Sequence, residues 1–422
     1  MITETTPQAA GSSITTVAAI RAQFPALARS EAGQTVAYFD GPGGTQVPQS
    51  VVDAVADYLL HHNANSHWSF PTSIETDAAL DAARRALADF VGGTPREIVF
   101  GANMTTLTYH LCRALAPRLG PGDEIVVTEL DHQANIAPWT RLAAERGIRI
   151  LTVPMIPETG GLDWDAFEGV LSLRTQLVAV GAASNAIGTI NDVARAVSMA
   201  QGVGALTFVD AVHYAAHSRV DVKQWDCDFL SCSAYKFYGP HVGVLWGREE
   251  LLAELDVPKL APAPDAAPCR FETGTQNHEG IVGAAAAVEF LASLAEAGDR
   301  SSRLDCALAG LHRRGDELFE QLWQGLAEIP AINLFGPSPG EPRTPTLGFT
   351  LGSMPSGEVA TRLAADHAIF VSDGDFYASS VIAALGVAEQ GLVRVGCACY
   401  TTAEEIDRVI SAVRSLAASE NL

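Results

Sequence analysis

Continuous apolar runs alternate with amphipathic stretches between about residues 50 and 250 of the chain. Short runs of Val, Ile and Leu between helical patterns are typical of a mainly parallel sheet that is covered by helices on both faces. The pattern predicts helices at 50–61, 75–91, 105–116, 135–146, 164–171 and 193–202, and strands at 98–100, 124–128, 149–153, 177–181, 206–210, 229–232 and 242–246. We therefore expect a large α/β domain built on a seven-stranded sheet.

The flanking regions have different patterns. A short amphipathic helix is expected at 15–29, broken near its end by Phe24-Pro25, and a loop rich in Gly and Pro follows at 40–45. Residues 253–270 are rich in Pro and Ala and predict a long irregular connection. Beyond it we predict helices and strands that form a small α/β domain: helices at 280–295, 301–328, 356–366, 378–385 and 402–417, and strands at 332–335, 346–351, 369–372 and 393–398. Residues 37–296 are expected to form the large domain, and residues 1–36 with 297–422 the small one.

Composition narrows the class of protein. The 422 residues are 48% hydrophobic and 18% charged, which is typical of a folded globular chain. The net charge of −22 disfavours a nucleic acid partner, because a phosphate backbone would be repelled. Residues 1–16 lack the basic and apolar regions of a signal peptide, and no apolar run reaches membrane-spanning length. Seven cysteines without regular spacing favour reduced thiols, so we expect a cytoplasmic protein without a membrane partner.

One of the three lysines of the chain follows an apolar run, and the apolar run before that one ends in an aspartate. Asp210 ends the run 206–210, and Lys236 follows the next apolar run within Ser233-Ala234-Tyr235-Lys236. A pyridoxal phosphate site needs an amine for its Schiff base and a carboxylate that keeps the pyridine nitrogen protonated. The two residues therefore predict a pyridoxal phosphate enzyme, although a surface lysine after a strand would be the simpler interpretation.

Several further motifs, in matching order, resemble those of fold-type I pyridoxal phosphate enzymes of the class V aminotransferase group, and above all its cysteine desulfurase-like branch. The resemblance implies an L-amino acid substrate and Lys236 as the Schiff-base lysine. It also implies that Asp210 pairs with the pyridine nitrogen and that His132 stacks on the cofactor ring. Tyr235 stands where the family usually has His, and His213 stands where it usually has Gln, close to the 3′ oxygen of the cofactor.

The resemblance also assigns residues to the cofactor phosphate and to a neighbouring subunit. Phe100 to Thr106 ends a strand and opens a helix, so its amides and hydroxyls suit an anion, although ordinary helix capping would give the same pattern. The implied cofactor contacts are Thr105, Thr106, Ser233 and Asn185. Thr275, within Arg270 to Thr275, is expected to reach the phosphate of the neighbouring subunit, which implies a homodimer with shared active sites.

Arg394 matches the arginine that binds the α-carboxylate of the substrate, a role that suits a planar guanidinium fork. An ion pair at the protein surface is the alternative. His67 and Trp68 fall where the family lines its substrate pocket.

The likeness to cysteine desulfurases breaks at their nucleophilic cysteine. The matching stretch is Val371 to Ala378, in which Tyr377 stands at the position of the cysteine and Ser372 where a basic residue often lies. A phenol cannot accept sulfur as a persulfide. Cys397 and Cys399 are other thiols near Arg394, but on one face of a strand they are expected to be buried, and without a nearby His they do not form a metal site.

Four functions remain open. The first is a lyase that removes the Cα proton through Lys236 and expels a β substituent, a C–S lyase type of reaction. The second is a cysteine desulfurase that uses another thiol, and the third is an aminotransferase or epimerase. The fourth is a non-catalytic scaffold, which the presence of Lys236, Asp210, His132 and Arg394 disfavours.

Overall fold

The computed structural model of the protein describes residues 14–31 and 33–419. The expectation that residues 1–16 contain no signal peptide therefore lies almost wholly outside the described residues. Within them, no helix combines the length and the apolar character that a membrane span requires. The described side chains also include no group of three or more His, Cys, Asp or Glu that could hold a metal ion.

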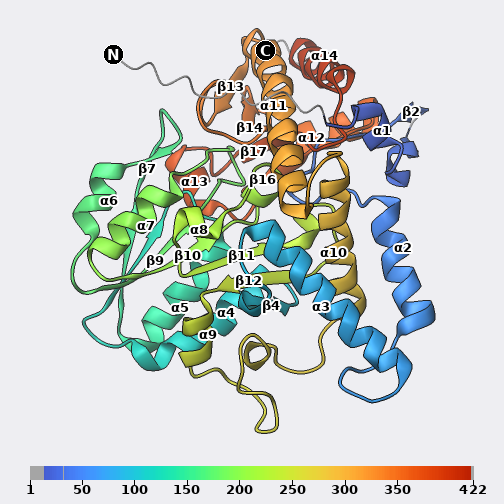
Figure 1. Cartoon of the computed structure of the whole chain (residues 1–422). Helices are drawn as coiled ribbons and strands as arrows, with labels where there is room; N and C mark the ends of the chain where they lie inside the picture. The colour runs from blue at the N-terminus through green and yellow to red at the C-terminus, as the bar shows by residue number, and fades with distance from the viewer. Residues whose placement is uncertain (1–13, 32, 420–422) are drawn as a thin grey trace, which may run out of the picture.

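A seven-stranded sheet lies at the centre of the large domain, as predicted (Figure 1). Its strands are β4 (Ile98–Gly101), β5 (Glu124–Thr128), β6 (Arg149–Val153), β9 (Thr175–Gly181), β10 (Leu206–Asp210), β11 (Phe229–Ser233) and β12 (Gly243–Gly247). They are arranged in the order β4-β12-β11-β10-β9-β5-β6. Strand β12 runs antiparallel to both of its neighbours, whereas the pairs from β11 to β6 are parallel.

Helices cover both faces of this sheet, because both faces are apolar. Ile98 and Phe100 of β4 join one hydrophobic core, and Val99 between them joins the other. Residues of α3, α7 and α10 belong to the first core, and residues of α4 and α5 to the second. The helices of this part are α2 (Gln49–Asp57), α3 (Pro71–Val91), α4 (Met104–Leu115), α5 (Ala137–Arg146), α6 (Trp164–Val170), α7 (Val193–Gly202), α8 (Val222–Trp225), α9 (Glu249–Glu254) and α10 (His278–Ser293).

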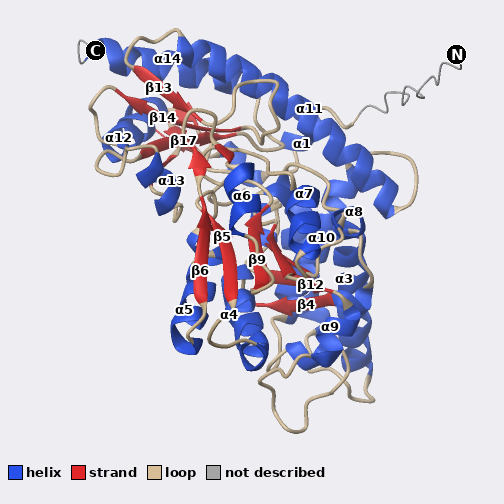
Figure 2. Cartoon of the chain, turned by 90° about the vertical axis from the view of Figure 1, so that its left-hand side faces the viewer, coloured by secondary structure: helices blue, strands red, loops and turns tan. Residues whose placement is uncertain are grey.

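The C-terminal part forms a second, antiparallel sheet in the order β13-β14-β17-β16. Figure 2 shows this sheet beyond one end of the large sheet, with long helices beside it. Its elements are α11 (Arg300–Ala327), β13 (Ile332–Phe335), β14 (Thr346–Leu351), α12 (Ser356–His367), β15 (Ile369–Phe370), β16 (Ser372–Gly374), α13 (Ser379–Ala384), β17 (Leu392–Gly396) and α14 (Ala403–Ser419). A third hydrophobic core, which includes Leu347, Phe349 and Val393, lies between this sheet and its helices.

A segment near the N-terminus joins the C-terminal part. Strand β3 (Ala37–Tyr38) pairs in parallel with β15, and the Phe39 side chain is buried in the third core. Arg21, at the end of α1 (Val17–Arg21), forms an ion pair with Glu405 of α14 at 3.0 Å. Two small antiparallel ladders complete the fold: β1 (Ser30–Glu31) with β2 (Gln34–Thr35), and β7 (Met155–Ile156) with β8 (Gly161–Leu162).

Two predicted elements differ from the structure. The expected helix at 15–29 is only the short α1, followed by one helical turn at Pro25–Ala28, because a proline lacks the N–H group that would continue the first helix. The single strand expected at 369–372 is two strands: β15 pairs with β3, and β16 pairs with β17. The other predicted helices and strands are present, with ends that shift by up to a few residues.

Candidate active site

Lys236 lies in the turn that follows β11, at the carboxyl end of the large sheet. Its amine donates hydrogen bonds to the carbonyl oxygens of Gly43, at 2.9 Å, and Pro42. Burial, with a smaller contribution from the positive charge of Arg394, lowers the pKa of Lys236 to about 8. A buried lysine with a lowered pKa is well suited to form a Schiff base or to act as a base.

Asp210 ends β10, the strand next to β11, and lines the same cavity as Lys236. Ligands commonly bind outside the carboxyl ends of the strands in sheets of this kind. One Asp210 oxygen accepts a hydrogen bond from the Val212 N–H at 2.9 Å. Burial raises the pKa of Asp210 to about 6, so the group remains a carboxylate at neutral pH and can pair with a protonated ring nitrogen.

His132 follows β5 and lies at the same end of the sheet. Its Nδ1 accepts a hydrogen bond from the Ala134 N–H at 2.9 Å, which assigns the remaining ring proton to Nε2. Burial is the main reason that the pKa of His132 is lowered to about 4. The imidazole is therefore neutral at ordinary pH, with one N–H available as a donor.

The N-terminus of α4 forms the anion-binding part of the cavity. Asn103 caps the helix by accepting a hydrogen bond from the Thr106 N–H at 2.9 Å, and the Thr106 hydroxyl donates to the Asn103 carbonyl oxygen. Ser233 is tied to this helix end, since its hydroxyl oxygen accepts a hydrogen bond from the Met104 N–H at 3.0 Å. These residues and Thr105 line the cavity, where the helix dipole favours a negative charge.

Arg394 of β17 connects the two parts of the fold. Its guanidinium donates to the Ser372 hydroxyl at 2.9 and 3.1 Å and to the Asn185 carbonyl oxygen at 2.9 Å. It also lies 4.1 Å from the centre of the Phe376 ring. These contacts fix the plane of the guanidinium, as recognition of a carboxylate requires.

The loop after β16 carries Phe376 and Tyr377 toward the large domain. The Asn185 side-chain amide donates to the Phe376 carbonyl oxygen at 3.0 Å, and the Gln133 N–H donates to that of Tyr377 at 2.7 Å. Both Phe376 and Tyr377 have a backbone φ of 56°, in the left-handed region that residues other than glycine rarely adopt. A loop held in this conformation by hydrogen bonds from the other domain is a common feature of functional sites.

Two adjoining cavities connect these residues. The inner one, of about 600 Å³, contains Asp210, His213 and the α4 terminus, and the outer one, of about 570 Å³, contains Arg394 and Tyr377. Both are lined by Thr105, His132, Ala134, Asn185, Tyr235 and Lys236. The structure therefore brings together most of the site residues expected from the sequence.

His213 and Tyr235 form part of the wall of the inner cavity. The Nε2 atom of His213 forms hydrogen bonds with the hydroxyl groups of Thr344, at 2.9 Å, and Thr346, at 3.1 Å. Burial lowers the pKa of His213, which keeps the ring neutral. Tyr235 stacks on His241, with ring centres 4.9 Å apart and an angle of 16° between the planes.

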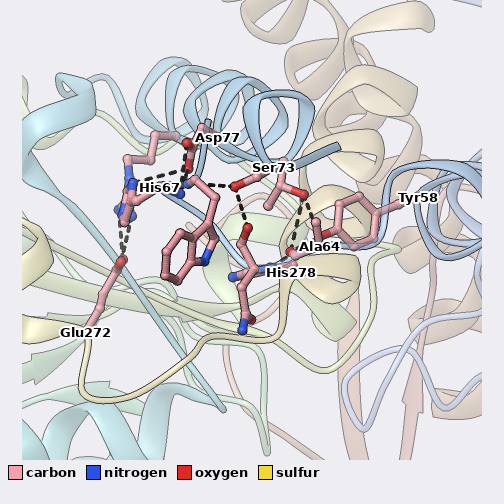
Figure 3. Close-up of polar contacts among 11 residues, drawn as sticks. Tyr58, Ala64, His67, Ser73, Asp77, Glu272 and His278 are labelled. Atoms are coloured by element: carbon pink, nitrogen blue, oxygen red, sulfur yellow. Dashed lines mark hydrogen bonds and ion pairs between the residues drawn. The ribbon is translucent and has the colours of Figure 1, made fainter. Parts of the chain in front are cut away.

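Three predicted site residues do not line the cavities that contain Lys236: His67, Trp68 and Thr275. They line a third cavity, of about 650 Å³, which does not include Lys236. Figure 3 shows His67, Asp77 and Glu272 in this region. The His67 N–H donates to the Asp77 carboxylate at 3.0 Å, and Glu272 forms an ion pair with Arg84 at 2.6 Å. A single chain thus does not place these three residues in the inner or the outer cavity.

Sequence reasoning did not identify three groups at the site. The carbonyl groups of Pro42 and Gly43 hold the Lys236 amine, and the Gly-Pro-rich composition at 40–45 was the available signal. Asp131 also lines the inner cavity, and burial raises its pKa to about 7. Its position directly before His132 was the signal that could have identified it.

The inner cavity fits pyridoxal phosphate. Asn185 Oδ1 is buried and has no hydrogen-bond partner among the described residues, so an acceptor is available to a ligand. A dianionic phosphate suits the α4 terminus with Thr105 and Ser233, and Asp210 suits a protonated pyridine nitrogen. Lys236, in the same cavity, supplies the amine.

Known proteins share this fold over most of its length. The chain matches the aminotransferase class-V family over residues 37–409. A cysteine desulfurase of Pectobacterium carotovorum is 32% identical to it over 413 residues, which cover 94% of this chain and 97% of the relative. The apo structure of a cysteine desulfurase from Thermococcus onnurineus NA1 matches with a TM-score of 0.84 and 29% identity, covering 91% of this chain and 95% of that one. The structure of the Escherichia coli cysteine desulfurase CsdA matches with a TM-score of 0.83 and 28% identity, covering 96% and 99%.

Proposed function

Because the chain belongs to the aminotransferase class-V family, whose members use pyridoxal phosphate, we propose that it is a β-eliminating enzyme of L-amino acids. The family match and the related solved structures confirm the predicted fold-type I enzyme and its cofactor. The proposed reaction removes the Cα proton of a β-substituted amino acid and expels the substituent. A Cβ–S bond is the expected target.

The observation that carries this proposal is the lack of a thiol at the site. No cysteine lines the inner or the outer cavity, and all seven cysteines are within the described residues. We align Tyr377 with the sulfur-accepting cysteine of the cysteine desulfurase-like branch. Cys397 and Cys399 are buried, and burial raises the pKa of each to about 12, so neither is a ready nucleophile. Elimination needs no nucleophilic thiol.

The residues that line the two cavities have different roles in the proposed reaction. Bound pyridoxal phosphate supplies the electron sink that stabilises negative charge at the substrate Cα. The Lys236 amine takes the Cα proton, which its lowered pKa makes feasible near neutral pH. The His132 Nε2–H is a proton donor beside the outer cavity, and Arg394 holds the substrate carboxylate.

Desulfuration of cysteine is the second candidate, because the relative and both solved structures above are cysteine desulfurases. Without a thiol in either cavity, this reaction requires an external sulfur acceptor that enters the outer cavity. Its products, alanine and sulfane sulfur, differ from those of elimination.

Product analysis tests the proposal. The purified, pyridoxal phosphate-loaded protein is given L-cysteine and a set of β-substituted L-amino acids. Pyruvate with ammonia supports elimination, and alanine with sulfane sulfur would replace it with desulfuration. A keto acid that retains the β substituent would instead indicate an aminotransferase, and a racemised substrate an epimerase.

The proposal also covers assembly and location. We propose a homodimer in which His67, Trp68 and Thr275 serve the site of the neighbouring subunit, since one chain places them away from Lys236. The seven cysteines, an odd number without regular spacing, support a reducing, cytoplasmic location.

A further inference from the structure

The outer cavity is large for an amino acid with a small side chain. Its volume of about 570 Å³ adjoins the inner cavity, where the cofactor fits. Cavities of about 300–1,000 Å³ are typical of sites for drug-sized ligands. Free cysteine has a single thiol beyond its Cβ and would occupy only a small part of the space that one chain encloses.

Among the residues that line the outer cavity, two sets bear on the choice of substrate. Asp40, Ser372 and Arg394 form a polar set, linked by the Arg394 contacts with Ser372 at 2.9 Å and with Asp40 at 4.0 Å. The apolar set comes from α4, α5 and the loop after β16, and consists of Tyr109, Ala137, Pro138 and Tyr377. Within the polar set, Arg394 and Ser372 suit the carboxylate of an amino acid. The apolar set suits an apolar side chain.

The aromatic members of the apolar set are exposed while their backbones are fixed. Tyr377 is 71% exposed and Tyr109 is 39% exposed. The backbone of Tyr377 is held by the Gln133 N–H, and its own N–H donates to the Asp375 carboxylate at 3.0 Å. Tyr109 lies within α4. An aromatic ring on a fixed backbone has few rotatable bonds left, so it can bind an apolar group with a small loss of conformational freedom.

We propose that the outer cavity selects S-substituted L-cysteines whose sulfur carries an aromatic or other bulky apolar group. This inference rests on the proposed β-elimination and deepens it by naming the substrate class. The Cα–H and Cβ–S bonds break, and the sulfur leaves with the bonding electron pair and takes a proton as a thiol. Water converts the remaining three-carbon unit to pyruvate and ammonia, with no change in oxidation state that needs another reagent.

Three substrates separate this inference from the proposed function. The holoenzyme is given β-chloro-L-alanine, S-methyl-L-cysteine and S-benzyl-L-cysteine, and pyruvate is measured. Chloride is a small leaving group and tests elimination without help from the apolar set. The two thioethers have similar leaving groups but differ in bulk, so kcat/KM for the benzyl compound is expected to be higher by about tenfold or more.

The outcomes test two statements, that the protein catalyses β-elimination and that it prefers S-substituted cysteines with a bulky apolar group. Pyruvate from β-chloro-L-alanine, with no preference for the benzyl over the methyl compound, would overturn the substrate class and leave elimination standing. The absence of pyruvate from all three compounds would overturn elimination and the inference that depends on it. Pyruvate from all three with the benzyl preference supports both.

Variants and a binding measurement locate the preference. Tyr377→Ala and Tyr109→Ala are expected to reduce the benzyl-to-methyl ratio of kcat/KM by about tenfold, while Tyr377→Phe, which keeps the ring, retains the ratio. Binding to cofactor-loaded Lys236→Ala protein, measured by calorimetry, is expected to show the same preference without turnover. Equal ratios in Tyr377→Ala, Tyr109→Ala and the parent protein would show that the apolar set does not select the substrate.

Discussion

The ring of Tyr377 lies 5.6 Å from the ring of His132, and their planes are inclined at 42°. Tyr377 comes from a loop of the C-terminal part, and His132 follows β5 of the large sheet. The backbone contact between Gln133 and Tyr377 holds the two elements together at 2.7 Å. A change at Tyr377 therefore acts beside the imidazole that is expected to stack on the cofactor.

Replacement of Tyr377 by cysteine is expected to supply a thiol that accepts sulfur as a persulfide. After exposure to L-cysteine with radiolabelled sulfur, Tyr377→Cys protein should retain label that a reductant releases, because its thiol lies in an exposed loop beside the outer cavity. Tyr377→Ser is the control of similar size without a thiol. Equal labelling of the two variants would contradict the idea that Tyr377 closes the persulfide route.

Capture of the cofactor by the apoprotein should depend on pH through Lys236. Only the neutral amine forms a Schiff base, and its fraction rises as pH increases through the lowered pKa of about 8. The second-order rate of capture, followed by the absorbance of pyridoxal phosphate, should therefore rise from pH 6.5, reach half of its maximum near pH 8 and level off above about pH 9. A rate that keeps rising toward pH 10 would mean that the amine has its ordinary pKa.

Gly243→Ala is expected to disturb the phosphate-binding end of α4. A Cβ at this position of β12 would lie 2.4 Å from the Asn103 carbonyl carbon, so the helix cap must shift. We expect the unfolding free energy to fall by about 1–3 kcal/mol and the affinity for pyridoxal phosphate to fall with it. Gly169→Ala is the control, because that position in α6 has open space around it and alanine favours a helix. An unchanged cofactor affinity in Gly243→Ala would contradict the assigned phosphate cradle.

Arg394→Lys should weaken the use of every amino acid substrate. Lysine keeps the charge but loses the planar fork that Ser372 and Asn185 orient. Since a hydrogen bond to a charged group contributes about 1.5–3 kcal/mol, kcat/KM is expected to fall by roughly ten- to a hundredfold. Steady-state kinetics with two substrates of different side chains would measure it, and a loss confined to one of them would argue against a carboxylate contact.

The proposed shared sites predict complementation between two inactive variants. Lys236→Ala lacks the amine, and Thr275→Asp places a negative charge where the neighbouring phosphate is expected. After the two proteins are unfolded and refolded together, mixed dimers should contain one site with both native residues. Activity that appears on mixing, and is absent from each variant refolded alone, is the expected result. No recovery in an assembled mixed dimer would contradict shared sites.

The sequence predicted the seven strands because each is a continuous apolar run, and the run that ends at Asp210 lies beside the one that leads to Lys236. The same reasoning could not identify the Gly43 carbonyl as a partner of Lys236, because a backbone group leaves no side-chain pattern. It also could not predict the left-handed backbone at Phe376 and Tyr377, which contacts from the other domain maintain. Local patterns predicted the elements, whereas contacts between domains determined the details of the site.

The pairing of β3 with β15 has a consequence for exchanging parts between relatives. A gene segment that begins at α11 would carry the second sheet but not β3 or Phe39, and so would leave the β15 edge and part of the third core uncovered. A chimera that transplants this domain needs two crossovers, one in each half of the gene. A transferred N-terminal segment that includes Pro42 and Gly43 would also contain the loop that holds the Lys236 amine. The transplanted domain would then bring part of the environment of that lysine with it.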